Sequence, residues 1–120
     1  MVGSAPGLVD TAGRISGNRD VWLETVCAPG KLRNGTTVSD AIGGASCRPR
    51  VGRGGMIHYL EYDSDFLMRN SLAKSNFSHY ASGKSGSMVF AFAVRAKKYT
   101  RSLEPLTQFG FTINEVPHRR

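Results

Sequence analysis

The sequence predicts an α+β fold, in which a small, mostly antiparallel sheet of about four to five strands carries one main helix on a face. Runs of alternating apolar residues indicate strands, one capped apolar run indicates a helix, and the order of these runs favours α+β. A chain of 120 residues fits one domain. We expect residues 19–120 to form it, behind a flexible, Gly/Ser-rich lead-in of residues 1–18.

Two regions make up the first half of the expected domain. Residues 19–28 (RDVWLETVCA) alternate between two sets of side chains, which predicts a first strand. Residues 29–55 contain Pro-Gly, Asn-Gly and Gly-Gly pairs, so we expect a long loop there. Within that loop, Ser39 is placed to cap a single helical turn over residues 39–42.

The clearest strand signal is residues 56–63 (MIHYLEYD). Alternation places Ile57, Tyr59 and Glu61 on one face, and Met56, His58, Leu60 and Tyr62 on the other. The main helix follows over about residues 64–76, with Asp63 or Ser64 as its cap and acidic side chains at the positive end of the helix dipole.

The remaining elements alternate between turn-rich and apolar segments. Residues 81–87 (ASGKSGS) predict a loop, and residues 88–96 (MVFAFAVRA) an apolar, central strand. Residues 101–108 predict a turn or short helix around Pro105, and residues 109–116 (FGFTINEV) the last strand. We expect Trp22 and the phenylalanines to build the core.

The two cysteines, Cys27 and Cys47, lie twenty residues apart, each close before a proline. Two thiols without a CxxC spacing or a nearby histidine are a poor zinc or redox set. Reduced, buried thiols are one alternative, but a disulfide suits a Gly-rich domain and is the interpretation we favour. It implies a secreted, periplasmic or cell-envelope protein.

The net charge is +7, from 16 Lys and Arg against 9 Asp and Glu. Such an excess favours an anionic partner, which is a nucleic acid, an anionic cell-envelope polymer or an acidic protein surface. An ordinary solvated surface is the alternative. The contact residues that we expect come from two basic segments: Arg48, Arg50, Arg53, Arg95, Lys97, Lys98 and Arg101.

Four residues suggest a catalytic alternative: His58, Glu61, Arg95 and His118. Transfer of a phosphodiester needs a base, an acid and a guanidinium that stabilises the developing charge. In residue type and chain order the set resembles the small secreted microbial ribonucleases, and HYLEY is similar to the segment that carries the first catalytic histidine of fungal ribotoxins. The resemblance implies a metal-independent ribonuclease. Alternation, however, puts His58 and Glu61 on opposite strand faces.

Other site signals are weak. Glu61, Asp63 and Asp65 could serve a hard cation, but helix capping explains the last two without a metal. Gly83-Lys84-Ser85 lacks the earlier glycine and the following helix of a nucleotide-binding loop. No apolar run is long enough to span a membrane, and we expect no metal and no cofactor.

We therefore expect a small exported binding protein, non-enzymatic, with a basic surface for an anionic partner. The alternatives are the secreted ribonuclease or toxin-type nuclease described above, and an inhibitor or immunity-type protein that binds another protein. The oligomeric state has no signal in the sequence.

Overall fold

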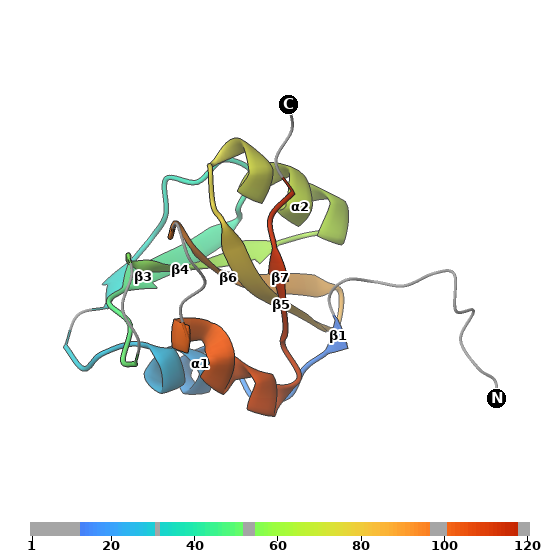
Figure 1. Ribbon diagram of the computed structural model, residues 1–120. Helices are drawn as coiled ribbons and strands as arrows, with labels where there is room; N and C mark the ends of the chain where they lie inside the picture. Colours follow the sequence, from blue (N-terminus) through green and yellow to red (C-terminus); the bar gives the residue numbers. More distant parts are fainter. Residues whose placement is uncertain (1–12, 31, 52–54, 97–100, 118–120) are drawn as a thin grey trace, which may run out of the picture.

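The computed structural model describes residues 13–30, 32–51, 55–96 and 101–117. It confirms the α+β class and shows three layers, with α2 on one face of a sheet and α1 and the 3₁₀-helix η1 on the other (Figure 1). The helices are α1 (Arg19–Val26), α2 (Asp65–Lys74) and η1 (Arg101–Phe109). The strands are β1 (Gly13–Arg14), β2 (Arg33–Asn34), β3 (Gly43–Cys47), β4 (Ile57–Tyr62), β5 (His79–Ser85), β6 (Met88–Val94) and β7 (Thr112–Glu115).

Among the described residues the sheet has seven strands, six of them in the order β1-β5-β6-β4-β3-β2, and β7 also pairs with β5. Only β1 runs parallel to its neighbour among the strands described; the other pairings are antiparallel. The sheet is thus larger than the predicted four to five strands. The apolar strand β6 is central, as predicted, and lies between β4 and β5.

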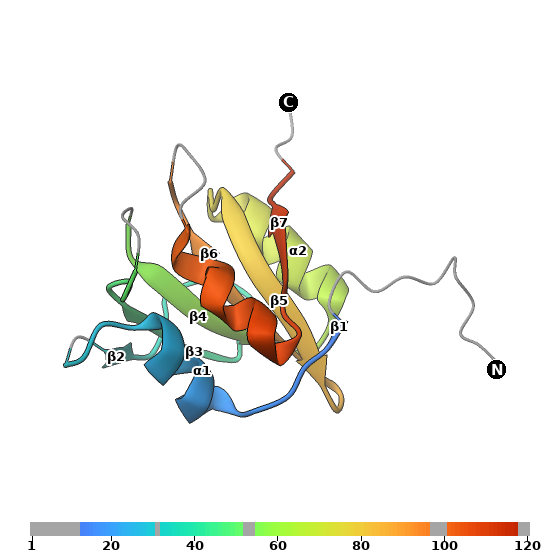
Figure 2. The same cartoon turned by 60° about the horizontal axis from the view of Figure 1, so that its bottom comes forward.

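The predicted strand over residues 19–28 is wrong, because residues Arg19–Val26 form helix α1. Asn18 caps the helix, and its side-chain oxygen accepts from the Val21 amide at 3.1 Å. Trp22, Leu23 and Val26 are buried on one helical face, a spacing that fits a helix and not a strand, where neighbouring side chains point to opposite faces. Figure 2 shows α1 and the orange η1 side by side across this face of the sheet.

Two segments predicted as loops contain strands. Residues 29–55 include β2 and β3, with Arg33 opposite Ser46 and Ser46 opposite His58. The segment 81–87 lies mostly in β5, where seven residues pair with β6. The predicted helical turn at Ser39–Ile42 is a non-helical turn followed by a bend. Gly and Ser mask strand signals, because they carry no apolar side chain to reveal alternation.

Residues inside the predicted lead-in also belong to the fold. β1 pairs with β5 at Gly83 and Lys84, and Ile15 is buried. The side chain of Ile15 fills the space above Gly83, where a Cβ would meet it at 2.1 Å. The folded part therefore reaches closer to the N-terminus than the expected boundary at residue 19, while residues 1–12 lie outside the described residues.

Helix α2 matches the predicted main helix, and its two ends show why. Ser64 caps it and accepts from the Leu67 amide at 3.1 Å. At the other end Asn76 has a positive φ of 62°. The Phe77 amide bonds to Leu72 and the Asn76 amide to Ala73, which is a Schellman ending. This ending turns the fully buried ring of Phe77 back against the sheet.

The predicted alternation of side chains along β4 is confirmed, and the two faces of the strand contribute to two separate core clusters. Ile57 and Tyr59 join the cluster under α1 and η1, whereas Leu60 and Tyr62 join the cluster under α2. Tyr62 also closes a buried hydrogen-bond chain to α2, since its hydroxyl lies 2.8 Å from that of Ser71, which donates to the Ser39 carbonyl at 2.6 Å. Side chains of β4 thus face one of two separate environments.

Candidate anion-binding site

The predicted disulfide is confirmed: Cys27 at the end of α1 bonds to Cys47 at the end of β3, with their Cα atoms 5.5 Å apart. Backbone hydrogen bonds reinforce the junction. The Ala28 amide donates to the Arg48 carbonyl at 2.8 Å, and the Arg50 amide donates to the Val26 carbonyl at 2.7 Å. The residues that follow each cysteine are therefore held side by side.

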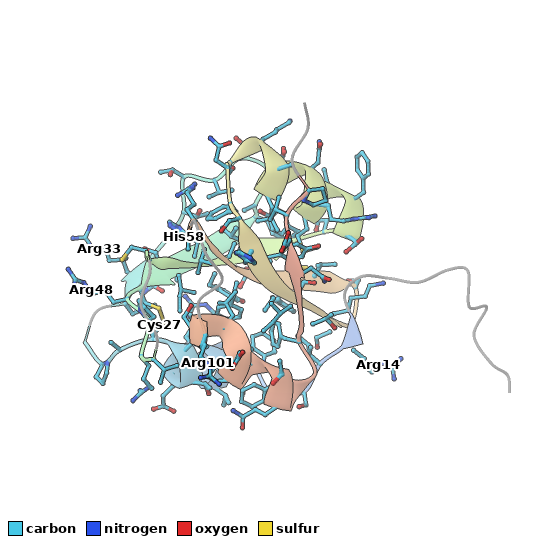
Figure 3. The ribbon with its side chains drawn as sticks, viewed as in Figure 1. Arg14, Cys27, Arg33, Arg48, His58 and Arg101 are labelled. Carbon is cyan, nitrogen blue, oxygen red and sulfur yellow. A yellow bond between two sulfur atoms is a disulfide. The ribbon has the colours of Figure 1, made fainter. Side chains whose placement is uncertain are left out.

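Next to this junction lies a hollow of about 550 Å³, which we call the Arg33–Arg48 hollow. It is lined by Gly30, Leu32, Arg33, Arg48 and Met56. Both arginines are exposed, and Figure 3 shows their side chains projecting together from one side of the molecule. None of these lining residues is acidic.

The two arginines reach the hollow from different parts of the chain. Arg33 lies in the short edge strand β2, and Arg48 follows directly after β3, so the pairing of β2 with β3 brings them together. Within the described residues, neither guanidinium forms a hydrogen bond or an ion pair. Two guanidinium groups without a partner among the described residues therefore face the solvent at this hollow.

Arg33 was not among the predicted contact residues. In the sequence it stands apart from the basic segments, in a stretch rich in Gly, Asn and Thr that reads as loop. Its neighbour Lys31 gives a weak local excess of charge, which was the one signal available. Only the register of β2 against β3 places Arg33 near Arg48.

The other predicted contact residues have different surroundings. Arg50 donates from Nε and from one terminal nitrogen to the Glu24 carbonyl, at 3.2 and 3.0 Å. Arg95 donates to the Ser75 carbonyl at 2.8 Å, and Arg101 pairs with Glu104 at 3.4 Å. These three guanidinium groups are already used within the fold. Arg53, Lys97 and Lys98 lie outside the described residues.

A second region, which we call the Phe77 corner, consists of His58, Ser75, Phe77 and Arg95. The His58 and Phe77 rings lie 5.2 Å apart, edge to face, and the Arg95 guanidinium carbon lies 4.1 Å from the centre of the Phe77 ring. Burial, and secondly the charge of Arg95, lower the pKa of His58. Both causes disfavour the charged form of His58.

Glu61 lies on the opposite face of β4, where Oε2 accepts from the Tyr59 hydroxyl at 2.6 Å. Burial, followed by this bond and the carboxylate charge, raises the pKa of Tyr59 well above its ordinary value. Gly43 leaves room for the carboxylate, since a Cβ there would lie 2.5 Å from Oε1. Arg19 stacks over Tyr59 with its guanidinium carbon 5.6 Å from the ring centre.

The four residues of the predicted ribonuclease set are not brought together. His58 and Arg95 are neighbours, but Glu61 points into the other side of the sheet, and His118 lies outside the described residues. Asp65 pairs with Arg69 at 2.9 Å, and no group of three His, Cys, Asp or Glu side chains suited to a metal occurs among the residues described.

None of the described helices has the length and apolar composition needed to cross a lipid bilayer. In comparisons with protein-family models, with curated proteins and with solved structures, the chain matches none of them.

Proposed function

We propose that the protein is an exported, non-enzymatic binding protein that takes an anionic partner at the Arg33–Arg48 hollow. The observation that carries the proposal is the pair of exposed guanidinium groups around one hollow, without an acidic partner in the part of the chain that is described. An arginine that the fold does not use is available to a ligand. Two of them at one place favour a bound anion over mere solubility.

The scaffold behind the hollow favours binding because it is already formed. The disulfide and the backbone hydrogen bond from Ala28 to Arg48 fix the position of the Arg48 main chain before any ligand arrives. Arg33 is fixed by the pairing of β2 with β3. A preformed site loses less entropy on binding, which improves affinity.

Export is supported by the same disulfide, because such bonds persist in oxidising compartments and are rare in the cytosol. A fractionation of the producing cells, with the thiol state of Cys27 and Cys47 measured in each fraction, tests this part. Oxidised protein in the exported fraction supports it; a fully reduced, cytosolic pool contradicts it.

Titration with two fluorescent polyanions, poly-L-glutamate and polyuridylate, tests the binding. If two arginines neutralise two anionic groups, the dissociation constant rises roughly fivefold to tenfold as the salt concentration rises from about 50 to about 200 mM. Arg33→Gln and Arg48→Gln should each weaken binding by about tenfold at low salt. Arg14→Gln is the matched control, because Arg14 is exposed on the opposite side of the molecule (Figure 3).

Failure of both polyanions to bind at low salt contradicts the proposal. Binding that Arg14→Gln weakens as much as Arg48→Gln contradicts the assignment to this hollow and indicates attraction by net charge.

Ribonuclease activity stays a prediction, and the separation of His58 from Glu61 does not favour it. Incubation of the protein with RNA and EDTA tests it directly, since the chemistry implied by the resemblance needs no metal. Cleavage that disappears in His58→Ala would reinstate the catalytic alternative.

A further inference from the structure

We propose that the anionic partner is a segment of another protein, in which one or two carboxylates are followed by an aliphatic side chain. This inference rests on the proposed function and deepens it, since it selects an acidic protein surface over a nucleic acid or an anionic polymer. It depends on what surrounds the Arg33–Arg48 hollow.

A second hollow of about 310 Å³ adjoins the first, and the two share Gly30 and Leu32. Its lining is mostly apolar and comprises Leu23, Cys27, Ala28, Pro29, Gly30 and Leu32, with Arg50 beside them. Leu32 is 43% exposed and Met56, in the first hollow, is 36% exposed. A ligand that crosses the boundary therefore passes from a cationic to an apolar surface.

Two acidic residues, Asp20 and Glu24, complete the second hollow. Both are exposed, and the side chain of Asp20 is 92% accessible. The two carboxylates outnumber Arg50, the one cation in this lining, so a polyanion that continued from Arg33 and Arg48 into this hollow would meet a net negative charge. A ligand whose negative charge is confined to one end meets no such repulsion.

The residues at this site also argue against single-stranded nucleic acid. Proteins that bind single strands stack bases on exposed aromatic side chains. The residues lining both hollows include no aromatic side chain among those described. Leucine, methionine and proline favour an aliphatic group, and the planar guanidinium fork suits a carboxylate.

The two hollows thus fit adjacent groups of one extended peptide. A carboxylate lies between Arg33 and Arg48, and the aliphatic side chain that follows it covers Leu32. This arrangement, a charge-assisted anchor beside a small apolar contact, is typical of weak recognition of a linear segment.

A set of short fluorescent Gly/Ser peptides tests the inference. The probe carries a central Glu-Glu-Leu sequence; matched peptides carry Gln-Gln-Leu or Glu-Glu-Ser, and polyuridylate serves as the polyanion. We expect Glu-Glu-Leu to bind about tenfold more tightly than Gln-Gln-Leu and about fivefold more tightly than Glu-Glu-Ser. Arg48→Gln should reduce the first difference and Leu32→Ser the second, while Arg14→Gln preserves both.

Two other results separate this inference from the proposed function. If polyuridylate binds with Arg48-dependent affinity and the leucine makes no difference, the peptide inference is wrong and the anion site stands. If neither Glu-Glu-Leu nor the polyanions bind at low salt, both are wrong. Circular dichroism of each variant verifies that it is folded.

Discussion

The Arg33–Arg48 hollow and the Phe77 corner both contain exposed arginines beside strands of the same sheet, but these arginines have different surroundings. In the corner, Arg95 covers the Phe77 ring and donates to the Ser75 carbonyl. In the hollow, Arg33 and Arg48 contact no described acid or carbonyl. Basic residues that look alike in the sequence therefore differ in the structure: some stabilise the fold, and others remain available to a ligand.

The largest effect that we expect comes from the corner. Phe77→Ala removes a fully buried ring against which His58 and Arg95 pack. The free energy of unfolding should fall by about 3–5 kcal/mol, as for other buried aromatic truncations. Chemical denaturation measures it. In the fraction that remains folded, affinity for poly-L-glutamate should be unchanged; a parallel loss of affinity would show that the two regions are not separate.

The second largest effect that we expect comes from removing the disulfide, which should lower both stability and affinity. The Cys27→Ala/Cys47→Ala variant loses a cross-link over 20 residues, which corresponds to about 3 kcal/mol in the chain-entropy estimate. Because the bond holds the segment that carries Arg48, affinity for poly-L-glutamate should also fall. A stable variant with full affinity would contradict the preformed hollow.

The smallest effect that we expect is on the pH dependence of stability. It distinguishes the Phe77 corner, which contains His58, from the Arg33–Arg48 hollow, which contains arginines. The pKa of His58 lies below its ordinary value of 6.5, so the unfolded chain takes up this proton at a higher pH than the folded protein does. The His58 contribution to stability is therefore constant at neutral pH and turns unfavourable as the pH falls through the ordinary value. His58→Gln should make stability decline less between about pH 7.5 and pH 5.

Denaturation of both proteins at the two pH values measures this difference. The arginines that line the hollow keep their charge throughout this range, so Arg48-dependent binding should not follow the His58 titration. An equal decline in wild type and His58→Gln would contradict a lowered pKa.

The sequence predicts some elements well for identifiable reasons. In β4, alternating side chains match the burial seen on both faces, and Ser64, one of the two predicted cap residues, caps α2. Residues 19–28 were predicted as a strand because two sets of side chains alternate there, whereas the residues that the fold buries, Trp22, Leu23 and Val26, follow the spacing of one helical face. Strands β3 and β5 were not predicted, because their Gly, Ala and Ser residues are typical of loops in a sequence that does not reveal which strands pair.

The candidate site was predicted only in part, and the reason is geometric. Charge along the chain identified Arg48 but could not tell it from Arg50, two residues away, whose guanidinium bonds to the Glu24 carbonyl. Nor could it identify Arg33, which reaches the hollow through strand pairing. Whether a cation is available depends on which carbonyls and carboxylates the fold places beside it.

The measurement that tests this account most directly compares Arg48→Gln with Arg50→Gln for both stability and binding. Arg50→Gln should lower the free energy of unfolding by about 1 kcal/mol, because it loses exposed hydrogen bonds to Glu24. Arg48→Gln should change it by less than about 0.5 kcal/mol. Affinity for poly-L-glutamate at low salt should fall about tenfold for Arg48→Gln and much less for Arg50→Gln. Equal losses of affinity, or a larger loss of stability for Arg48→Gln, would contradict the division between cations used by the fold and cations left for a partner.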